Sequence, residues 1–435
     1  MALAHAIVGR EAELQLLREV LGGRGPPHAV FVEGDAGVGK TALLGAVVEG
    51  AAMPVLRARP TAAEAASSYA ALHDLLQPVL DGLDALPTPQ RRALAAALLL
   101  EDAAGPVDPR LVALACRSLL AARPGEVLLA VDDWQWLDAA TSAVLTFVLR
   151  RLEPDGTKML ATVRSGEADD ALAALVHALP EGHALELVVA PLGAPALAAL
   201  VHARTGERPA PRALARLHEA CGGNPLMALE LIRAPGAGTA TDVRRLLAHR
   251  IGELPADSRA LLRVVAAQAE PTVDSVGEDG LEAALAADVL ARDGHRLRFT
   301  HPLIAAVVEE RTPPAEWRSI HARLAASATS QEQRARHLAA AANGPGETVA
   351  AALEAAAGEA EARGAPIAAA ELAERAAELT RPPTRRAEST GCSRRRPPRS
   401  TRLTGRAPGG CSTRCSPRTP WAGSAPTRCT SSRTW

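Results

Sequence analysis

Short apolar runs alternate with helical patterns along the first half of the chain. Continuous runs of Val, Leu, Ala and Phe predict buried strands at residues 28–33, 54–60, 127–131, 158–164 and 185–189. Between them, apolar residues recur every three or four positions, as at Leu14, Leu17 and Leu21, which would share one helical face. Strands buried on both faces and separated by helices indicate a parallel sheet with helices on both sides. We therefore predict an α/β domain over residues 1–192.

Helical patterns dominate the chain after this domain. Residues 193–235 predict a small all-α bundle, which includes the turn Gly222-Gly223-Asn224-Pro225. Residues 236–315 predict two helices, a third over 280–292, a short hairpin over 293–300 and a helix from Pro302, an order typical of a winged helix.

Residues 316–380 are rich in Ala, Glu, Arg and Leu. The helical pattern breaks at 327–330, 343–346 and 364–366. Helices of this length with short breaks predict the start of a tetratricopeptide-like α-solenoid, a surface for a sensor or a partner.

A glycine-rich segment follows the first predicted strand directly. It fits G-x-x-x-x-G-K-[ST] and comprises Gly34, Asp35, Ala36, Gly37, Val38, Gly39, Lys40 and Thr41, with Ala42 next in the helix. Gly34, Gly37 and Gly39 tolerate positive φ, so successive backbone N–H groups can point at phosphate oxygens. Lys40 would reach the β- and γ-phosphates, and the Thr41 hydroxyl would ligate magnesium. The segment predicts a site for ATP or ADP with Mg²⁺.

A second motif places two carboxylates at the end of a buried strand. Val127 to Asp138 reads Val-Leu-Leu-Ala-Val-Asp-Asp-Trp-Gln-Trp-Leu-Asp. A parallel strand delivers such residues to the carboxyl edge of the sheet, where ligands bind. Asp132 would hold magnesium through water, and Asp133 would orient the attacking water. Fast ATPases have Glu at the position of Asp133, and Asp is one methylene shorter. We therefore expect slow hydrolysis, with Asp133 and Lys40 as the catalytic residues.

Composition limits the remaining function classes. The chain has only two lysines, Lys40 and Lys158, so the lysine in the glycine-rich segment stands out. No signal peptide pattern and no apolar run of 18 residues occurs, which favours a cytoplasmic protein without a membrane partner. Residues 1–380 carry a net charge near −13, which argues against a broad nucleic-acid surface there. The cysteine spacing predicts neither disulfides nor a zinc site.

The last 55 residues, 381–435, have a different character. They contain 13 arginines and one acid, Glu388, and Leu403 is their only aliphatic residue larger than alanine. This composition predicts a disordered basic tail. A natural tail and out-of-frame translation both fit, and the abrupt loss of the helical pattern favours the second.

Several motifs in this order resemble those of signal-transducing STAND ATPases, and most closely the large ATP-binding regulators of the LuxR family. They are Gly9-Arg10-Glu11, the glycine-rich segment, Val131-Asp132-Asp133-Trp134, Ala161-Thr162-Val163-Arg164, Gly222-Gly223-Asn224-Pro225 and Phe299-Thr300-His301-Pro302-Leu303. The resemblance covers about 1–380. We find no pattern for the family's long solenoid or its C-terminal helix-turn-helix in residues 1–435, so no sequence-specific DNA binding is expected from this chain.

The resemblance implies further site residues, each with a plainer alternative. Val8, Gly9 and Arg10 would lie near the adenine, or only cap a surface helix. The strand end at Thr162 and Arg164 would sense the γ-phosphate, or be an ordinary strand end. Asn224 and Pro225 would pack against the nucleotide, or form a simple turn. His301 would reach the ADP phosphate, or only cap the helix begun by Pro302.

The function that follows is a nucleotide switch of a transcriptional regulator. ADP would hold the winged helix closed, and an unknown inducer with ATP would open it for self-association. Two alternatives remain. A metabolic P-loop kinase would need an acceptor site and an arginine-rich lid that the sequence does not show. An AAA+ origin-binding or DNA-remodelling ATPase shares the Gly-Arg-Glu entry, but the Asp132-Asp133 pair and the Gly-Gly-Asn-Pro turn disfavour it.

Overall fold

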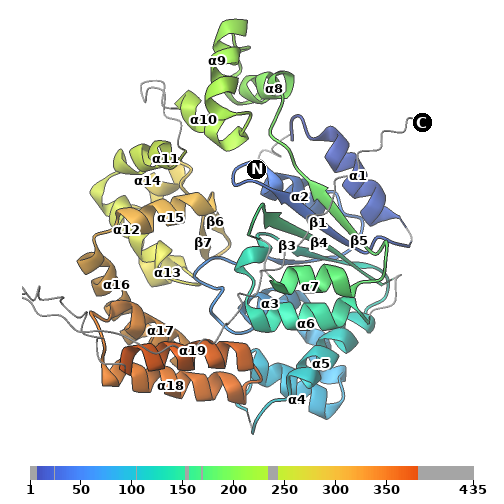
Figure 1. Cartoon of the computed structure of the whole chain (residues 1–435), viewed down its shortest axis with the longest axis vertical. Helices are drawn as coiled ribbons and strands as arrows, with labels where there is room; N and C mark the ends of the chain where they lie inside the picture. Colours follow the sequence, from blue (N-terminus) through green and yellow to red (C-terminus); the bar gives the residue numbers. More distant parts are fainter. Residues whose placement is uncertain are drawn as a thin grey trace, which may run out of the picture. The chain divides into compact units, whose positions relative to one another are not determined.

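A five-stranded parallel sheet forms the centre of the N-terminal region (Figure 1). In the computed structural model its strands are β1 (Ala29–Gly34), β2 (Val55–Ala58), β3 (Val127–Val131), β4 (Thr157–Arg164) and β5 (Ala184–Val188). Their order is β2-β3-β4-β1-β5. The predicted parallel α/β sheet is confirmed, and β4 lies beside β1.

The structure describes residues 7–23, 25–103, 105–151, 156–167, 170–233 and 243–380. The described residues belong to one compact unit of the chain, Met1–Thr384. The predictions for the link at 234–241 and for the basic tail at 381–435 lie outside the described residues. Within the described part, no helix is long and apolar enough to cross a membrane.

Alternate residues of the central strands face two separate apolar cores. Val30 and Val32 of β1 pack with α1 (Glu11–Gly22) and α2 (Lys40–Glu49) on one side. Ala29 and Phe31 pack on the other side, in a larger core. This core includes α3 (Ala70–Leu76), α4 (Thr88–Ala97), α5 (Pro109–Ala121), α6 (Ala139–Leu149), α7 (Asp170–Ala178) and part of the 3₁₀ helix η1 (Gln77–Ala85). The strand period of two therefore gives the sheet helices on both faces, as predicted.

The next helices form two smaller apolar cores. Helices α8 (Ala194–Thr205), α9 (Pro211–Cys221) and α10 (Pro225–Arg233) contribute to one of them. The second core includes residues from α11 (Val243–Gly252), α12 (Ala256–Ala266), α14 (Leu281–Ala286), α15 (Pro302–Arg311) and the hairpin of β6 (Leu290–Asp293) and β7 (Arg296–Phe299). A short helix, α13 (Val273–Val276), packs beside it and was not predicted.

The prediction of a third helix over 280–292 was wrong at its C-terminal end. The helix ends at Ala286, and Leu290 to Asp293 form the first strand of the hairpin instead. Asp288 adopts a left-handed backbone with φ of 55°, which breaks the helix and turns the chain. Val289 and Leu290 then enter the apolar core. The assignment of a winged helix to this region stays a prediction.

Four helices complete the described chain: α16 (Pro314–Ser327), α17 (Gln331–Ala341), α18 (Glu347–Ala362) and α19 (Pro366–Thr380). The breaks between them, at 328–330, 342–346 and 363–365, lie within one residue of the predicted ones. Alanines and leucines of α17, α18 and α19 join the same apolar core as the helices beneath the sheet. The Tyr69 hydroxyl donates to Gly364 O at 2.6 Å, and Val107 N donates to Ala362 O at 2.8 Å.

Glu332 on α17 is the charged centre of this contact, and only 3% of it is exposed. Its Oε1 accepts hydrogen bonds from the backbone N–H and the hydroxyl of Ser68, both at 3.3 Å. Its carboxylate also pairs with Arg336 and with the buried Arg363. The helical segment is thus joined to the α/β domain by a satisfied buried carboxylate as well as by apolar contacts.

We predict that Glu332→Ala destabilises the protein by about 3–5 kcal/mol, because Arg363 would stay buried without its partner. The free energy of unfolding from urea denaturation measures this. Glu378→Ala is the matched control: the Arg375–Glu378 pair is more than half exposed, so its loss should cost no more than about 0.5 kcal/mol. Equal effects of the two changes would contradict a structural role for Glu332.

Candidate functional site

The glycine-rich loop occupies the turn from β1 to α2. Gly37 and Gly39 have φ of 82° and 105°, and Gly39 precedes the first residue of α2. Such a turn at a helix N-terminus directs backbone N–H groups toward a bound anion. Gly34 is needed for a different reason from the one predicted, because its φ is not positive. A Cβ there would lie 2.9 Å from Val189 O, just after β5. The close approach of this neighbouring segment therefore requires glycine at position 34.

Lys40 lies under this loop and is buried. Its Nζ donates to Gly34 O at 2.7 Å and to Asp35 O at 3.0 Å. Burial is the main reason why its pKa is lowered, while the negative charge of Asp133 acts in the opposite direction. A desolvated ammonium beside the loop is a strong potential partner for phosphate oxygens.

Asp132 accepts two side-chain hydrogen bonds on one oxygen. Thr41 Oγ1, at the start of α2, donates to Asp132 Oδ1 at 3.1 Å, and Thr162 Oγ1, on β4, donates to it at 2.8 Å. The Thr41 hydroxyl and the Asp132 carboxylate are therefore in direct contact. Hydroxyl and carboxylate oxygens are the hard ligands that Mg²⁺ prefers, so these residues fit the predicted metal.

Asp133 is held in an uncommon backbone conformation at the end of β3. Its φ of 63° is left-handed, a region that Asp tolerates better than most residues. Its N–H donates to Thr162 Oγ1 at 2.7 Å, and Gln135 Nε2 donates to its Oδ1 at 2.8 Å. Burial, followed by the charge of Asp132, raises the pKa of this carboxyl group. The carboxylate is fixed in place, as a group that orients a water molecule must be.

Arg164 and His301 lie close enough to Lys40 of the loop for electrostatic interactions, because Arg164 contributes to the lowered pKa of Lys40, and Lys40 contributes to that of His301. Arg164 Nε is 3.7 Å from Asp133 Oδ1, and its guanidinium lies 5.5 Å from the centre of the Trp136 ring. Burial, followed by the positive charges of Arg164 and Lys40, lowers the pKa of His301 to about 4. His301 is therefore neutral at pH 7.

The ring of His301 also caps α15. Its Nδ1 accepts a hydrogen bond from Leu303 N at 3.1 Å, which leaves the proton on Nε2. The plainer alternative, a helix cap, is thus observed, and the remaining Nε2–H is available to donate. Contact with a phosphate stays a prediction.

Residues 8–10 connect α1 to the loop rather than standing alone at the surface. Arg10 is buried, and its Nη2 donates to Val38 O at 3.1 Å and to Ala190 O at 2.5 Å. Gly9 has a φ of 74°, and a Cβ there would lie 2.4 Å from Ala196 Cβ on α8. Val8 is partly buried. Arg10 therefore holds the loop, and contact of the three residues with adenine stays a prediction.

The Gly-Gly-Asn-Pro turn touches the loop directly. Asn224 Nδ2 donates to Ala36 O at 2.9 Å, and Leu226 N donates to Gly37 O at 3.3 Å. Asn224 Oδ1 also accepts from Met227 N at 3.2 Å and so caps α10, which begins at Pro225. This turn is more than a link between helices, because it fixes α10 on the candidate phosphate site.

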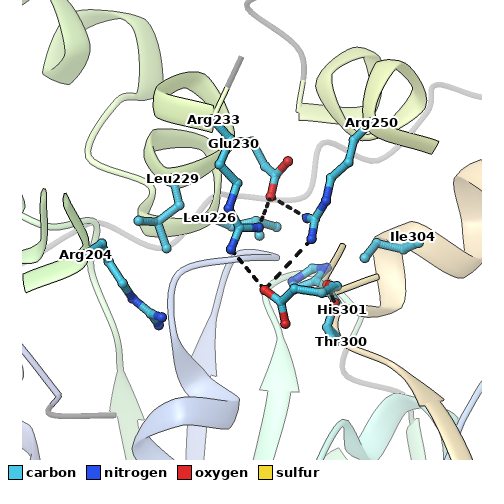
Figure 2. Close-up of a pocket in the computed structure, with 10 residues that line it drawn as sticks. Arg204, Leu226, Leu229, Glu230, Arg233, Arg250, Thr300, His301 and Ile304 are labelled. Atoms are coloured by element: carbon cyan, nitrogen blue, oxygen red, sulfur yellow. Dashed lines mark hydrogen bonds and ion pairs between the residues drawn. The ribbon is translucent and has the colours of Figure 1, made fainter. Parts of the chain in front are cut away.

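A cleft lies beside this contact (Figure 2). Leu226 and Glu230 of α10 line it together with Arg250 of α11 and His301 at the start of α15. Glu230 Oε1 pairs with Arg233 at 3.1 Å and with Arg250 at 2.7 Å. The buried Glu230 therefore joins the helices of the two smaller cores, next to His301.

Two residues of the site were missed from the sequence. Arg59 Nε lies 3.5 Å from Asp132 Oδ2, and its place near the carboxyl end of the second predicted strand, 54–60, was a usable signal. Gln135 donates to Asp133 and accepts from Arg164 N at 3.3 Å, so it joins two predicted residues. Nothing in the sequence pattern distinguishes this glutamine.

Residues 6–163 match the model of the AAA ATPase domain. This part of the chain is an AAA-like P-loop ATPase domain. It includes the loop, Asp132 and Asp133, while Asn224 and His301 lie beyond it. No curated protein matches the chain.

Solved structures resemble the ATPase domain and the region that follows it. A STAND protein with a tetratricopeptide repeat sensor from Pyrococcus horikoshii is 14% identical, with a TM-score of 0.52. The match covers 85% of this chain and 58% of that protein, so this chain spans little more than half of its neighbour's length. At this identity the likeness concerns the fold alone.

Two further structures are more distant. The Walker-type ATPase of Pyrococcus abyssi is 16% identical with a TM-score of 0.37, and the match covers 70% of this chain and 96% of that one. Cdc6p from Pyrobaculum aerophilum is 13% identical with a TM-score of 0.36, and the match covers 70% and 94% of the two chains.

We predict that Asn224→Ala loosens the loop of the ATPase domain. Loss of a hydrogen bond worth about 1 kcal/mol should speed amide hydrogen exchange of residues 35–39 about fivefold. Asn343→Ala, a change of the same type at an exposed position, should leave this exchange unaltered. Unchanged exchange in Asn224→Ala would show that the turn does not restrain the loop.

Proposed function

We propose that this chain binds ATP and ADP with Mg²⁺ and acts as a slow ATPase switch in signal transduction. The observation that carries the proposal is the direct contact between Thr41 at the start of α2 and Asp132 at the end of β3, beside the buried Lys40. Three chemically matched groups from two separate motifs meet at one helix N-terminus. This arrangement suits a nucleotide polyphosphate with a divalent ion.

Each group of the site then has a distinct task. Lys40 exchanges its two carbonyl partners in the loop for phosphate oxygens. Thr41 and Asp132 hold the metal, which supplies charge neutralisation at the phosphates when bound. Asp133 orients the attacking water, and Arg164 senses the γ-phosphate from the end of β4.

The proposal of a switch rests on the elements that close over the loop. Asn224 of the turn before α10 binds Ala36 O, and His301 at the start of α15 presents a neutral ring near Lys40. A nucleotide that contacts both elements can hold them in the ADP state and release them when an inducer and ATP bind. Self-association of the open form would follow.

The motif order further favours a transcriptional regulator of the LuxR type, acting in the cytoplasm. In this proposal, residues 1–192 are the ATPase domain, 193–235 a lid, 236–315 a winged helix and 316–380 the start of a tetratricopeptide-like sensor. The inducer would bind to the sensor.

The alternative of a DNA-remodelling ATPase would use the β6–β7 hairpin as a DNA-binding wing. The two arginines of β7 are already engaged within the chain: Arg296 pairs with Asp74 and Glu270, and Arg298 donates to Arg59 O. A wing that contacts DNA phosphates needs its basic side chains free. The arrangement therefore favours the switch.

We predict that Lys40→Ala abolishes ATP and ADP binding. Loss of charge-assisted hydrogen bonds to two phosphates, at about 1.5–3 kcal/mol each, should weaken affinity at least about 100-fold. Isothermal titration calorimetry measures the affinity, and circular dichroism shows that the variant is folded. Arg92→Ala, which removes an exposed positive charge on α4, should bind as the parent does. Parental affinity in a folded Lys40→Ala variant would refute the assignment of the site.

We also predict that Asp133→Asn keeps nucleotide binding but loses hydrolysis by about 100-fold or more, because an amide cannot accept the proton of the attacking water. Phosphate release under single-turnover conditions measures this. Asp81→Asn, an exposed change of the same kind, should leave turnover intact. Undiminished turnover in Asp133→Asn would assign Asp133 a purely structural role.

A further inference from the structure

Arg59 reaches the candidate metal site from a strand that carries neither motif. In the β2–β3 pairing Ala58 lies beside Val131, and Asp132 N donates to Ala58 O at 3.0 Å. The segments that follow β2 and β3 therefore leave the sheet side by side. Arg59 lies on the first segment and Asp132 on the second. This register brings Arg59 Nε to 3.5 Å from Asp132 Oδ2.

The two oxygens of the Asp132 carboxylate have different partners. Oδ1 accepts both threonine hydroxyls, and Oδ2 faces Arg59. The Asp132 side chain is 6% exposed, whereas that of Arg59 is 33% exposed. A buried carboxylate needs a countercharge, and Arg59 supplies it from the solvent side. A magnesium ion at Thr41 would supply the same charge, so the two cations repel each other across one carboxylate.

The main chain of Arg59 is joined to a second region. Its carbonyl oxygen accepts a hydrogen bond from Arg298 Nη1 on β7 at 2.9 Å. On the same strand, Arg296 Nη1 donates to both carboxylate oxygens of Asp74, at 2.9 and 3.1 Å. The β6–β7 hairpin thus rests on the end of β2 and on α3, and a shift of the main chain at Arg59 would act directly on one of these anchors.

We propose that Arg59 is a positioning residue that neutralises Asp132 until magnesium binds, and that its displacement by magnesium loosens the β6–β7 hairpin. This inference rests on the proposed function and adds to it a route from the metal to the region of residues 243–311. The nucleotide contacts at Asn224 and His301 act on other elements. Arg59 makes the hairpin respond to the metal in particular.

The first test is the magnesium requirement of nucleotide binding. A fluorescent ribose-labelled ATP is titrated with MgCl₂, starting from EDTA. Arg59→Gln should reach half-maximal magnesium response at about tenfold lower concentration, because the competing charge is gone. Arg59→Lys, which keeps the charge, should stay close to the parent, and so should Arg92→Gln at an exposed position.

The second test is amide hydrogen exchange of residues 290–299. In the parent, exchange should be faster with labelled ATP and Mg²⁺ than with labelled ATP and EDTA. Arg298→Gln removes the anchor, so its hairpin should exchange fast in both conditions.

The possible failures are distinguishable. An unchanged magnesium midpoint in folded, nucleotide-binding Arg59→Gln, or a parental hairpin indifferent to Mg²⁺, would overturn the role of Arg59 and leave the proposed function standing. Absence of nucleotide binding by the parent, with and without magnesium, would overturn the proposed function itself.

Discussion

The carboxylate of Asp132 joins the segments from which the candidate site is built. Thr41 at the start of α2 and Thr162 on β4 donate to the same oxygen, and Arg59 after β2 faces the other. This meeting depends on strand register, because β2, β3, β4 and β1 are parallel and end at one edge of the sheet. A slip of one residue would turn Thr162 to the opposite face and break the arrangement. The burial of alternate strand residues in two opposite apolar cores therefore fixes the register on which the polar site depends.

The strands and the two central motifs of the candidate site could be predicted from the sequence, because each of them depends on a pattern within a single segment. The run before Asp132 is apolar at every position, so a buried strand and the placement of two acids at its end follow directly. The spacing of Gly34, Gly39 and Lys40 similarly specifies a phosphate loop. Predicting these two features does not require knowing which helices and strands contact one another.

The contacts that depend on docking could not be predicted in this way. Asn224 binds Ala36 O across 188 residues of sequence, and the pairing of Arg59 with Asp132 depends on the order of the strands. The helix expected over 280–292 failed for a local reason. Val289 and Leu290 suit a helix and a strand equally well, and the left-handed Asp288 decides between them. Glycine is required at position 34 because of the close approach of Val189 O, which lies more than 150 residues later in the sequence.

The apolar core beneath the sheet has a consequence for how such a protein can change over time. Alanines of α17, α18 and α19 share this core with Phe31 and Leu129 of the sheet, and Tyr69 binds Gly364 O across the contact. Helices α17, α18 and α19 are thus no detachable module, because they complete an apolar core of the ATPase domain. Exchange of these helices between proteins would require matching changes on the face of the sheet that carries Phe31 and Leu129. The two parts must therefore diverge together, and new specificity would be acquired more readily at helices farther from this wall.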